Sequence, residues 1–298
     1  MINRAVIAWL LLGLLWGTNF VFIKWSTEVV TPMQVALVRV IAGFLTVGGY
    51  ALLKGQLEVN HLRHTVHFTV MACLAAALYF YGFAEGTALL ESGLAGAVSA
   101  SIPLFSLVAA IIFLSDEKLT LNRVVGLMIG LVGMILITNP FSSKTGEFLL
   151  EGVLWMTLGS FSLGVSFVYA RKFVTPLKLP PAALTTYQLG FASLILLLVT
   201  DKSGLESLLS DTESMLVLVG GLGLIGTGLA YVLYYFVIEK LGAVRASALT
   251  YVPPVVALFL GAAFLGENIG MMDYIATVII FTGVILVNKN TRKTKGTE

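Results

Sequence analysis

The sequence predicts an all-α integral membrane protein with ten transmembrane helices, arranged as two inverted five-helix repeats around a central cavity. Three observations predict this fold. Of the 298 residues, 58% are hydrophobic and only 11% are charged, whereas soluble domains have about 45–50% apolar and about 25% charged residues. The apolar residues fall into ten windows of about 20 residues, the length that crosses a bilayer. The two halves of the chain also match each other.

Composition excludes several other classes of protein. The 18 Lys and Arg and the 16 Asp and Glu are too few to cover a soluble globule of this size. The single cysteine, Cys73, cannot form an internal disulfide. We therefore expect no large soluble domain, no disulfide scaffold and no nucleic-acid partner, and we expect the lipid bilayer as the main surroundings of a monomer.

Charged residues, prolines and glycines set the limits of the ten spans. The first apolar run is longer than a signal-peptide core and no small-residue cleavage site follows it, which favours an uncleaved transmembrane helix. The predicted spans are 5–26, 32–53, 65–86, 92–114, 120–139, 152–171, 181–200, 214–238, 243–265 and 270–288. The predicted domains are a first repeat over 1–140, a second repeat over 150–290 and a polar cytoplasmic tail over 291–298.

The distribution of basic residues predicts the orientation. One set of span ends holds fourteen Lys and Arg, namely Arg4, Lys54, Arg63, Lys118, Arg123, Arg171, Lys172, Lys178, Lys240, Arg245, Lys289, Arg292, Lys293 and Lys295. The opposite ends hold three, namely Lys24, Lys144 and Lys202. Because basic residues concentrate on the cytoplasmic side of membrane proteins, both termini are expected in the cytoplasm.

The two halves match at an offset of 150 residues. The matching pairs are Tyr81 with Tyr231, Pro103 with Pro253, Glu117 with Glu267 and Gly133 with Gly283. Because each half holds five spans, the second half must enter the membrane upside down. Inverted repeats are typical of secondary transporters, whose substrate site lies at the midplane between the halves.

The order of several short motifs resembles the ten-helix EamA-type family of the drug/metabolite transporter superfamily. These motifs are Trp16-Gly17-Thr18-Asn19-Phe20 through Lys24, Pro32 through Arg39, Pro103, Glu117-Lys118-Leu119-Thr120, and Gly126, Gly130 and Gly133. The second half departs from the pattern, with Leu163-Gly164 in place of the Trp-Gly pair and Gln188 in place of the arginine. The resemblance implies a transporter of the bacterial cytoplasmic (inner) membrane that exports amino acids or other small metabolites.

Prolines near the centres of spans four and nine suggest interrupted helices. Pro103 in span four, and Pro253 and Pro254 in span nine, each remove a helical hydrogen bond and free carbonyl groups that lipid cannot satisfy. They are either passive kinks or parts of spans that line a cavity. Ser99 and Thr250 fall on the same helical faces as these prolines, either as substrate contacts or as helix-packing residues.

Aromatic and amide side chains supply the other binding candidates. Trp16 and Asn19 share one face of the first span with Phe20 and Ile23, and Asn19 bonds either a substrate or another helix. The remaining candidates are polar or aromatic residues away from the membrane ends, namely Tyr79, Tyr81, Ser166, Gln188, Tyr231 and Tyr235. We expect the equivalent Tyr81 and Tyr231 to bracket the cavity or to form its gates.

Arg39 is the one basic residue well inside a span, where burial of a charge is expensive. Two roles fit it: binding a substrate carboxylate, or forming a structural ion pair with Glu85 or Glu28. Glu85 is the candidate for proton coupling, with an interfacial carboxylate as the alternative. Glu117 and Glu267 precede spans five and ten, where an acid stabilises a helix N-terminus.

No catalytic motif stands out, so an enzyme is not expected and no cofactor is predicted. The three histidines, His61, His64 and His67, cluster without a cysteine or an acid, and we expect no metal there. The scarcity of intramembrane charge favours neutral or zwitterionic cargo. The leading hypothesis is export of amino acids, with aromatic or hydrophobic ones preferred, by alternating access. The alternatives are efflux of drugs or other metabolites such as nucleosides and lipophilic cations, or a flippase-like lipid-facing protein.

Overall fold

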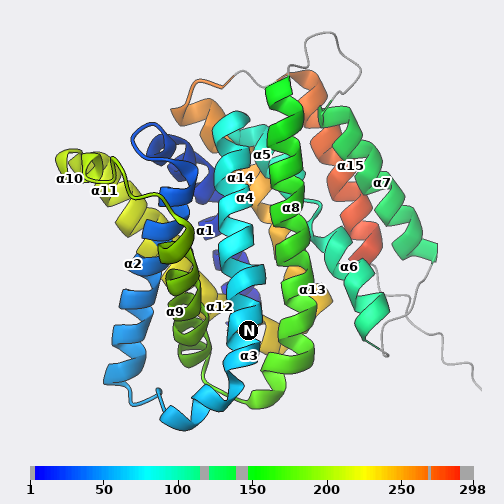
Figure 1. The fold of residues 1–298 in the computed structure, drawn as a ribbon. Coiled ribbons are helices and arrows are strands. Elements are labelled where there is room, and N and C mark those ends of the chain that lie inside the picture. Colours follow the sequence, from blue (N-terminus) through cyan, green and yellow to red (C-terminus); the bar gives the residue numbers. More distant parts are fainter. Residues whose placement is uncertain (1–3, 115–120, 139–146, 268–269, 289–298) are drawn as a thin grey trace, which may run out of the picture.

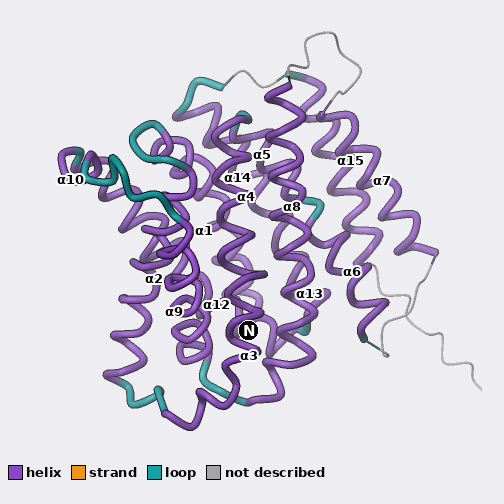
Figure 2. Tube along the Cα trace, in the orientation of Figure 1, coloured by secondary structure: helices purple, strands orange, loops and turns teal. Residues whose placement is uncertain are grey.

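The computed structural model describes residues 4–114, 121–138, 147–267 and 270–288, and within them every regular element is a helix (Figures 1 and 2). Most of these helices run side by side as one bundle. Large apolar side chains such as Leu154, Leu194 and Phe259 are exposed on its outside, as expected where lipid surrounds the protein. The predicted tail over 291–298 and Glu117 lie outside the described residues.

The first half contains five spans. They are α1 (Arg4–Thr27), α2 (Pro32–Leu53), a third span built from η1 (Val59–His64), α3 (Thr65–Ala72), η2 (Cys73–Ala77) and α4 (Leu78–Leu89), a fourth built from α5 (Ser92–Ser99) and α6 (Ile102–Phe113), and α7 (Leu121–Thr138).

The second half repeats this order. Its spans are α8 (Glu147–Tyr169) with η3 (Ala170–Val174) and η4 (Thr175–Leu177), α9 (Pro181–Val199), an eighth span preceded by α10 (Ser207–Ser210) and built from α11 (Thr212–Met215), η5 (Leu216–Leu229) and α12 (Ala230–Leu241), a ninth built from α13 (Ala243–Ser247), η6 (Ala248–Tyr251) and α14 (Val252–Phe264), and α15 (Met271–Asn288).

The predicted fold class is confirmed: the chain is an all-α, multi-pass membrane protein with a helix at each of the ten predicted spans. Within the described residues, seven helical stretches are long and apolar enough to cross a membrane, and Leu249–Phe264 and Tyr274–Gly283 are shorter apolar helices. The second span matches its predicted limits of 32–53 because its start is strongly encoded. Pro32 occupies the first turn, and Thr31 and Gln34 bond reciprocally in a capping box.

The loop before the eighth span ends in a similar cap. Asp211 accepts hydrogen bonds from the backbone N–H of Ser214 at 3.1 Å and from its hydroxyl at 2.9 Å. These two bonds favour the ionised form and lower the pKa of the Asp211 carboxyl. The cap fixes the point at which the chain turns back into the bundle.

Spans four and nine are both interrupted next to their prolines, as the sequence predicts. The fourth span breaks between α5 and α6, with Pro103 in the first turn of α6. The ninth changes from α13 through the 3₁₀ turn η6 to α14, with Pro253 and Pro254 at the start of α14. A proline has no N–H and clashes with the preceding turn, so the helix restarts there.

Spans three and eight each contain a π-helical segment, which the sequence analysis did not predict. In the third span it is the short η2, and in the eighth it is the longer η5. Moved by the repeat offset, η2 falls inside η5. A π segment leaves backbone carbonyls available to side chains from other helices, and such segments are frequent at functional sites.

Helix packing is equivalent in the two halves. The pairs α7 with α15 and α2 with α9 each join two equivalent helices, α5 packs on α14 as α13 packs on α6, and α1 packs on α14 as α8 packs on α6. In Figure 1, α7 and α15 lie side by side at one edge of the bundle. A Cβ on Gly133 would stand 3.0 Å from the carbonyl oxygen of Ala276, and one on Gly283 would stand 2.5 Å from that of Gly126. Adding 150 to Gly133 gives Gly283, and subtracting 150 from Ala276 gives Gly126, so the packing of α7 on α15 is two-fold symmetric at these residues.

Candidate functional site

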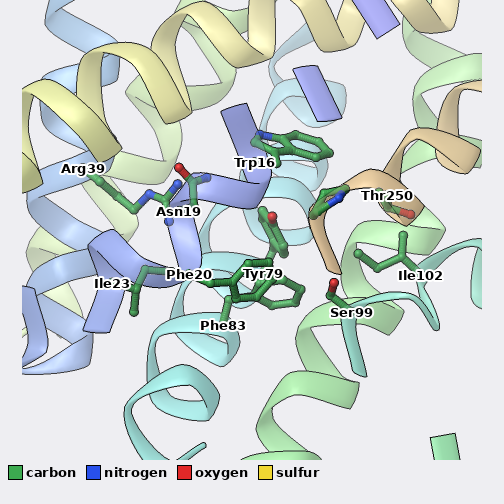
Figure 3. Close-up of a pocket in the computed structure, with 11 residues that line it drawn as sticks. Trp16, Asn19, Phe20, Ile23, Arg39, Tyr79, Phe83, Ser99, Ile102 and Thr250 are labelled. Carbon is green, nitrogen blue, oxygen red and sulfur yellow. The ribbon is translucent and has the colours of Figure 1, made fainter. Parts of the chain in front are cut away.

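A pocket lies between spans one, two, three, four and nine, where the interrupted spans meet the first helix (Figure 3). It is lined by Trp16, Asn19, Phe20, Ile23, Arg39, Tyr79, Phe83, Ser99, Ile102, Thr250 and Pro253. The space between these side chains is about 10 Å³, which is room for about one water molecule. The pocket is therefore closed around its centre.

One face of α1 forms a wall of this pocket. Trp16, Asn19, Phe20 and Ile23 all line it, because residues three, four and seven apart lie on the same side of a helix. Two glycines allow α1 to lie close to α14. A Cβ on Gly13 would stand 2.7 Å from the Cβ of Val252, and one on Gly17 would stand 2.4 Å from the Cβ of Val256. The small residue after Trp16 thus brings the wall close to the ninth span.

The Trp16 side chain is buried and carries an unused hydrogen-bond donor. Among the described residues, no acceptor bonds its indole Nε1. Its ring lies 6.3 Å from that of Tyr79 and 6.2 Å from that of Tyr231. A buried N–H without a partner is costly, so Trp16 offers a donor to whatever enters the pocket.

Arg39 brings a positive charge to the same pocket with only 1% of its surface exposed. Its Nε donates to the hydroxyl of Thr227 at 3.0 Å, and its guanidinium lies 3.9 Å from the ring centre of Phe80. With the side-chain amide oriented so that its oxygen faces the guanidinium, Asn19 accepts from Nη2 of Arg39 at 3.2 Å. All three partners are neutral.

The structural ion pair of Arg39 with Glu85 or Glu28, one of the two roles considered from the sequence, is absent: no carboxylate of the described residues lies within 4 Å of the guanidinium. Glu85 lies on α4, and its side chain is on a different face of that helix from the face that lines the pocket. Tyr79 lines the pocket, whereas Tyr81 stands about 200° farther round the helix at about 100° per residue. The ring of Tyr81 packs on that of Trp155, with ring centroids 5.1 Å apart. The structure therefore places Tyr81 away from the pocket, and Glu85, six residues after Tyr79, also falls outside the pocket lining.

A layer of buried tyrosines lies behind the pocket, on the eighth span. The ring of Tyr234 contacts that of Tyr231 in a tilted arrangement and that of Tyr235 edge to face, and the ring of Trp16 lies 6.2 Å from that of Tyr234. The hydroxyls of Tyr234 and Ser166 are 3.0 Å apart. Ser166 therefore supports the tyrosine layer and does not line the pocket.

Gln188 connects this layer to the third span. Its Nε2 donates to the carbonyl of Ala75 at 3.4 Å, and the same carbonyl accepts from the Tyr231 hydroxyl. Its Oε1 accepts from the Tyr235 hydroxyl. The acceptor Ala75 is available because it lies in the π segment η2. All of these groups are buried.

Arg39 and Gln188 occupy equivalent places in the two halves and reach equivalent segments. Arg39 on α2 bonds Thr227 in η5, while Gln188 on α9 bonds Ala75 in η2. The replacement of arginine by glutamine in the second half keeps a polar link to a π segment and removes the charge. The pocket is consequently electrically asymmetric, with its cation on one side.

The end of the bundle that is poor in Lys and Arg is tied together beyond the pocket. The Glu267 carboxylate accepts from the backbone N–H and the hydroxyl of Ser92, both at 2.7 Å, and from the N–H of Gly93 at 3.3 Å. Lys24 donates to the carbonyls of Thr87, at 3.3 Å, and Leu90. Glu267 therefore caps α5 in the fourth span, whereas the sequence analysis expected it to cap the tenth. α14 packs on α5, so the acid that follows α14 lies at the N-terminus of α5.

A second, larger cavity of about 430 Å³ opens at the opposite end, which we call the basic end because it carries most of the Lys and Arg. It is lined by Thr175, Lys178, Leu179, Pro181, Leu184, Tyr235 and Glu239. Tyr235 belongs both to this cavity and to the tyrosine layer. The layer therefore separates the cavity from the closed pocket.

The histidines at the basic end have ordinary partners. His67 Nδ1 lies 2.8 Å from the hydroxyl of Tyr169, and His61 Nδ1 lies 3.3 Å from that of Tyr187. Among the described residues, no group of three His, Cys, Asp or Glu side chains is placed to hold a metal.

The pocket contains six of the residues singled out from the sequence. They are Trp16, Asn19, Arg39, Tyr79, Ser99 and Thr250. Pro103 and Pro254 are each one residue from a lining residue, and Gln188, Tyr231 and Tyr235 form the layer behind. Sequence reasoning missed Phe83 and Ile102, and it named Pro253 as a helix-breaking residue only. Helical spacing could have found Phe83 and Ile102, since they follow Tyr79 and Ser99 by four and three residues.

The chain is similar to known membrane transporters along almost its whole length. The model of the EamA-like transporter family matches twice, at residues 3–139 and 150–289. An uncharacterized inner membrane transporter of Escherichia coli, YedA, is 26% identical over 93% of this chain and 88% of its own. An uncharacterized transporter of Bacillus subtilis, YdfC, is 25% identical over 92% of this chain and 87% of its own. One protein of known crystal structure aligns with a TM-score of 0.68 and 21% identity, covering 95% of this chain and 96% of that chain. That last likeness concerns the fold.

Proposed function

Since the chain belongs to the EamA-like transporter family, we propose that it exports amino acids with aromatic or apolar side chains across the cytoplasmic membrane. The observation that carries this proposal is Arg39, a buried cation in the pocket whose partners among the described residues are all neutral. Burial of an unpaired charge is expensive. A substrate carboxylate would remove that cost by pairing with the guanidinium.

The rest of the pocket fits the other parts of such a substrate. The free indole N–H of Trp16 is a second donor for a carboxylate. Phe20, Phe83 and Ile102 supply an apolar surface for a side chain, and the faces of Trp16 and Tyr79 favour an ammonium group. A single zwitterion can therefore use the cation, the donor and the aromatic surface together.

Other classes of cargo fit this pocket less well. A lipophilic cation would require an acid, and the described lining contains none. A polyanion would require several basic groups, and Arg39 is the one basic residue of that lining. These differences favour a substrate with one negative charge that is balanced within the molecule.

The mechanism we propose is alternating access between two inverted halves. The closed pocket is too small for an amino acid, so one side must open before a substrate enters. The interruptions in spans four and nine supply two equivalent bending points next to the pocket. The hydrogen bonds of Glu267 and Lys24 keep the end that is poor in Lys and Arg closed, while the cavity at the basic end is open. With the basic end in the cytoplasm, this state would load substrate from inside.

Transport by vesicles containing the purified protein tests the substrate class. We expect exchange of phenylalanine and no exchange of phenylalaninamide, which keeps the ring and the amine but lacks the carboxylate. Replacement Arg39→Gln should lower phenylalanine exchange by at least about tenfold, since a charge-assisted bond to a carboxylate is lost.

The control is Thr227→Val, which removes the hydrogen bond to Arg39 and keeps the charge. This variant should retain most of the exchange. Equal transport of phenylalanine and its amide, or equal losses in both variants, would contradict the assignment of Arg39 to the substrate. Transport of a drug cation or a nucleoside in place of amino acids would support the alternative cargo classes.

A further inference from the structure

The cavity at the basic end has one positive and one negative side chain in its lining, Lys178 and Glu239. They come from different helical spans: Lys178 follows η4 and Glu239 lies near the end of α12. The apolar residues Leu179, Pro181 and Leu184 and the buried Tyr235 also line the cavity. Its volume of about 430 Å³ falls within the range of small-molecule sites.

Neither charge uses the other as its partner. The Glu239 carboxylate lies 2.6 Å from the ammonium of Lys240, and both side chains are about half exposed, so that pair is weak. Among the described residues, no carboxylate lies within 4 Å of the Lys178 ammonium. Lys178 therefore has no carboxylate partner among the described residues, and Glu239 has a weak pair that a ligand ammonium group can replace.

Lys178 also holds an unusual backbone conformation. Its φ is 55°, and it is the one non-glycine residue with a positive φ in the described chain. The other four positive-φ positions described are glycines, which adopt this conformation without strain. A lysine is disfavoured there by its backbone, and its side chain lines the cavity.

We propose that this cavity is a first binding site for zwitterionic amino acids, ahead of the central pocket. Lys178 takes the carboxylate, Glu239 takes the ammonium group, and Leu179 and Leu184 contact the side chain. The proposal rests on the proposed function, because it assigns a second site to the same substrate. The first site adds a selection step, because a molecule with only one of the two charges binds there with lower affinity.

Tyr235 connects the cavity at the basic end to the central pocket through a series of contacts. Tyr235 lines the cavity and bonds Gln188, and Gln188 shares the carbonyl of Ala75 with Tyr231. The ring of Tyr231 in turn contacts Trp16 of the pocket. A substrate that displaces Tyr235 from Gln188 would pass directly from the first site into the pocket.

Thiol labelling tests binding at this cavity independently of transport. The chain has a single cysteine, so Cys73→Ser gives a background in which Thr175→Cys places one thiol in the cavity lining. Phenylalanine should slow the reaction of this thiol with a charged maleimide, and both phenylalaninamide and N-acetylphenylalanine should protect it less. Adding Lys178→Gln or Glu239→Gln should raise the half-protecting concentration of phenylalanine about fivefold, the effect of a partly exposed charge pair.

Three further variants make the result specific. Lys178→Gly should weaken protection without lowering thermal stability, because glycine suits the backbone conformation. Lys54→Gln, which changes a lysine of the basic end that does not line the cavity, should leave protection unchanged. Arg39→Gln should also leave it unchanged, because that residue belongs to the central pocket.

The outcomes separate this inference from the proposed function. If vesicles exchange no amino acid while protection depends on Lys178 and Glu239, the proposed function is wrong and the cavity still binds zwitterions. If exchange occurs without protection, or if Lys54→Gln acts like Lys178→Gln, the first binding site is wrong and the central pocket stands.

Discussion

At the residue scale, the buried hydrogen bond from the Tyr235 hydroxyl to Gln188 joins the eighth span to the seventh. Both residues are buried, and the Gln188 oxygen has the tyrosine hydroxyl as its donor. Replacement Tyr235→Phe would leave that oxygen without a donor. We expect the free energy of unfolding to fall by about 1–3 kcal/mol, the cost of one buried unsatisfied group, as measured by detergent-induced unfolding of the purified protein.

The matched control is Tyr274→Phe, which removes a hydroxyl from an exposed tyrosine of α15. This change should leave the unfolding free energy within about 0.5 kcal/mol of the parent. If both variants unfold alike, the Tyr235 hydroxyl makes no stabilising bond in the folded protein.

Residue positions could be predicted from the sequence only where chemistry marks one face of a helix. Trp16 and Asn19 mark a face of α1, and the structure places that face on the pocket. Tyr79 and Tyr81 have the same chemistry but lie on different sides of α4. A transmembrane helix is apolar all round, since lipid and protein interior are alike, so hydropathy does not distinguish its inner face. The interaction of Tyr81 with Trp155 depends on tertiary packing.

At the element scale, the interruption of the fourth span supplies a bending point that one residue controls. This interruption could be predicted from Pro103 alone, because the missing N–H belongs to the proline itself and does not depend on other helices. The π segments η2 and η5 were missed because they depend on donors from distant helices, such as Gln188 for Ala75. Local rules therefore predict proline breaks but not breaks that tertiary hydrogen bonds stabilise.

Restoring the missing helical hydrogen bond should stiffen this bending point. In Pro103→Ala, the new N–H can donate to the carbonyl of Ser99 and join α5 to α6. We expect slower amide hydrogen exchange around 100–104 and a fall in transport rate of about tenfold, because bending then requires an extra hydrogen bond to open. Exchange measured by mass spectrometry and transport measured in vesicles give the two readouts.

Pro176→Ala is the control for this change, since Pro176 lies in the short η4 outside the interrupted spans. It should change neither readout. Faster exchange in Pro103→Ala would mean that the proline stabilises the break, and unchanged transport with slower exchange would mean that the break is not a bending point.

At the scale of the whole molecule, the direction of transport depends on which end faces the cytoplasm. The two-fold packing of the halves makes the ends alike in architecture, so charge is what distinguishes them. Fourteen Lys and Arg lie at one set of span ends and three at the other. In the Cys73→Ser background, we expect Lys202→Cys to react with a membrane-impermeant thiol reagent in intact cells, and Lys54→Cys to react only after permeabilisation. The reverse pattern would place the basic-end cavity outside the cell, where this state would load substrate from the medium, and would contradict the proposed loading from the cytoplasm.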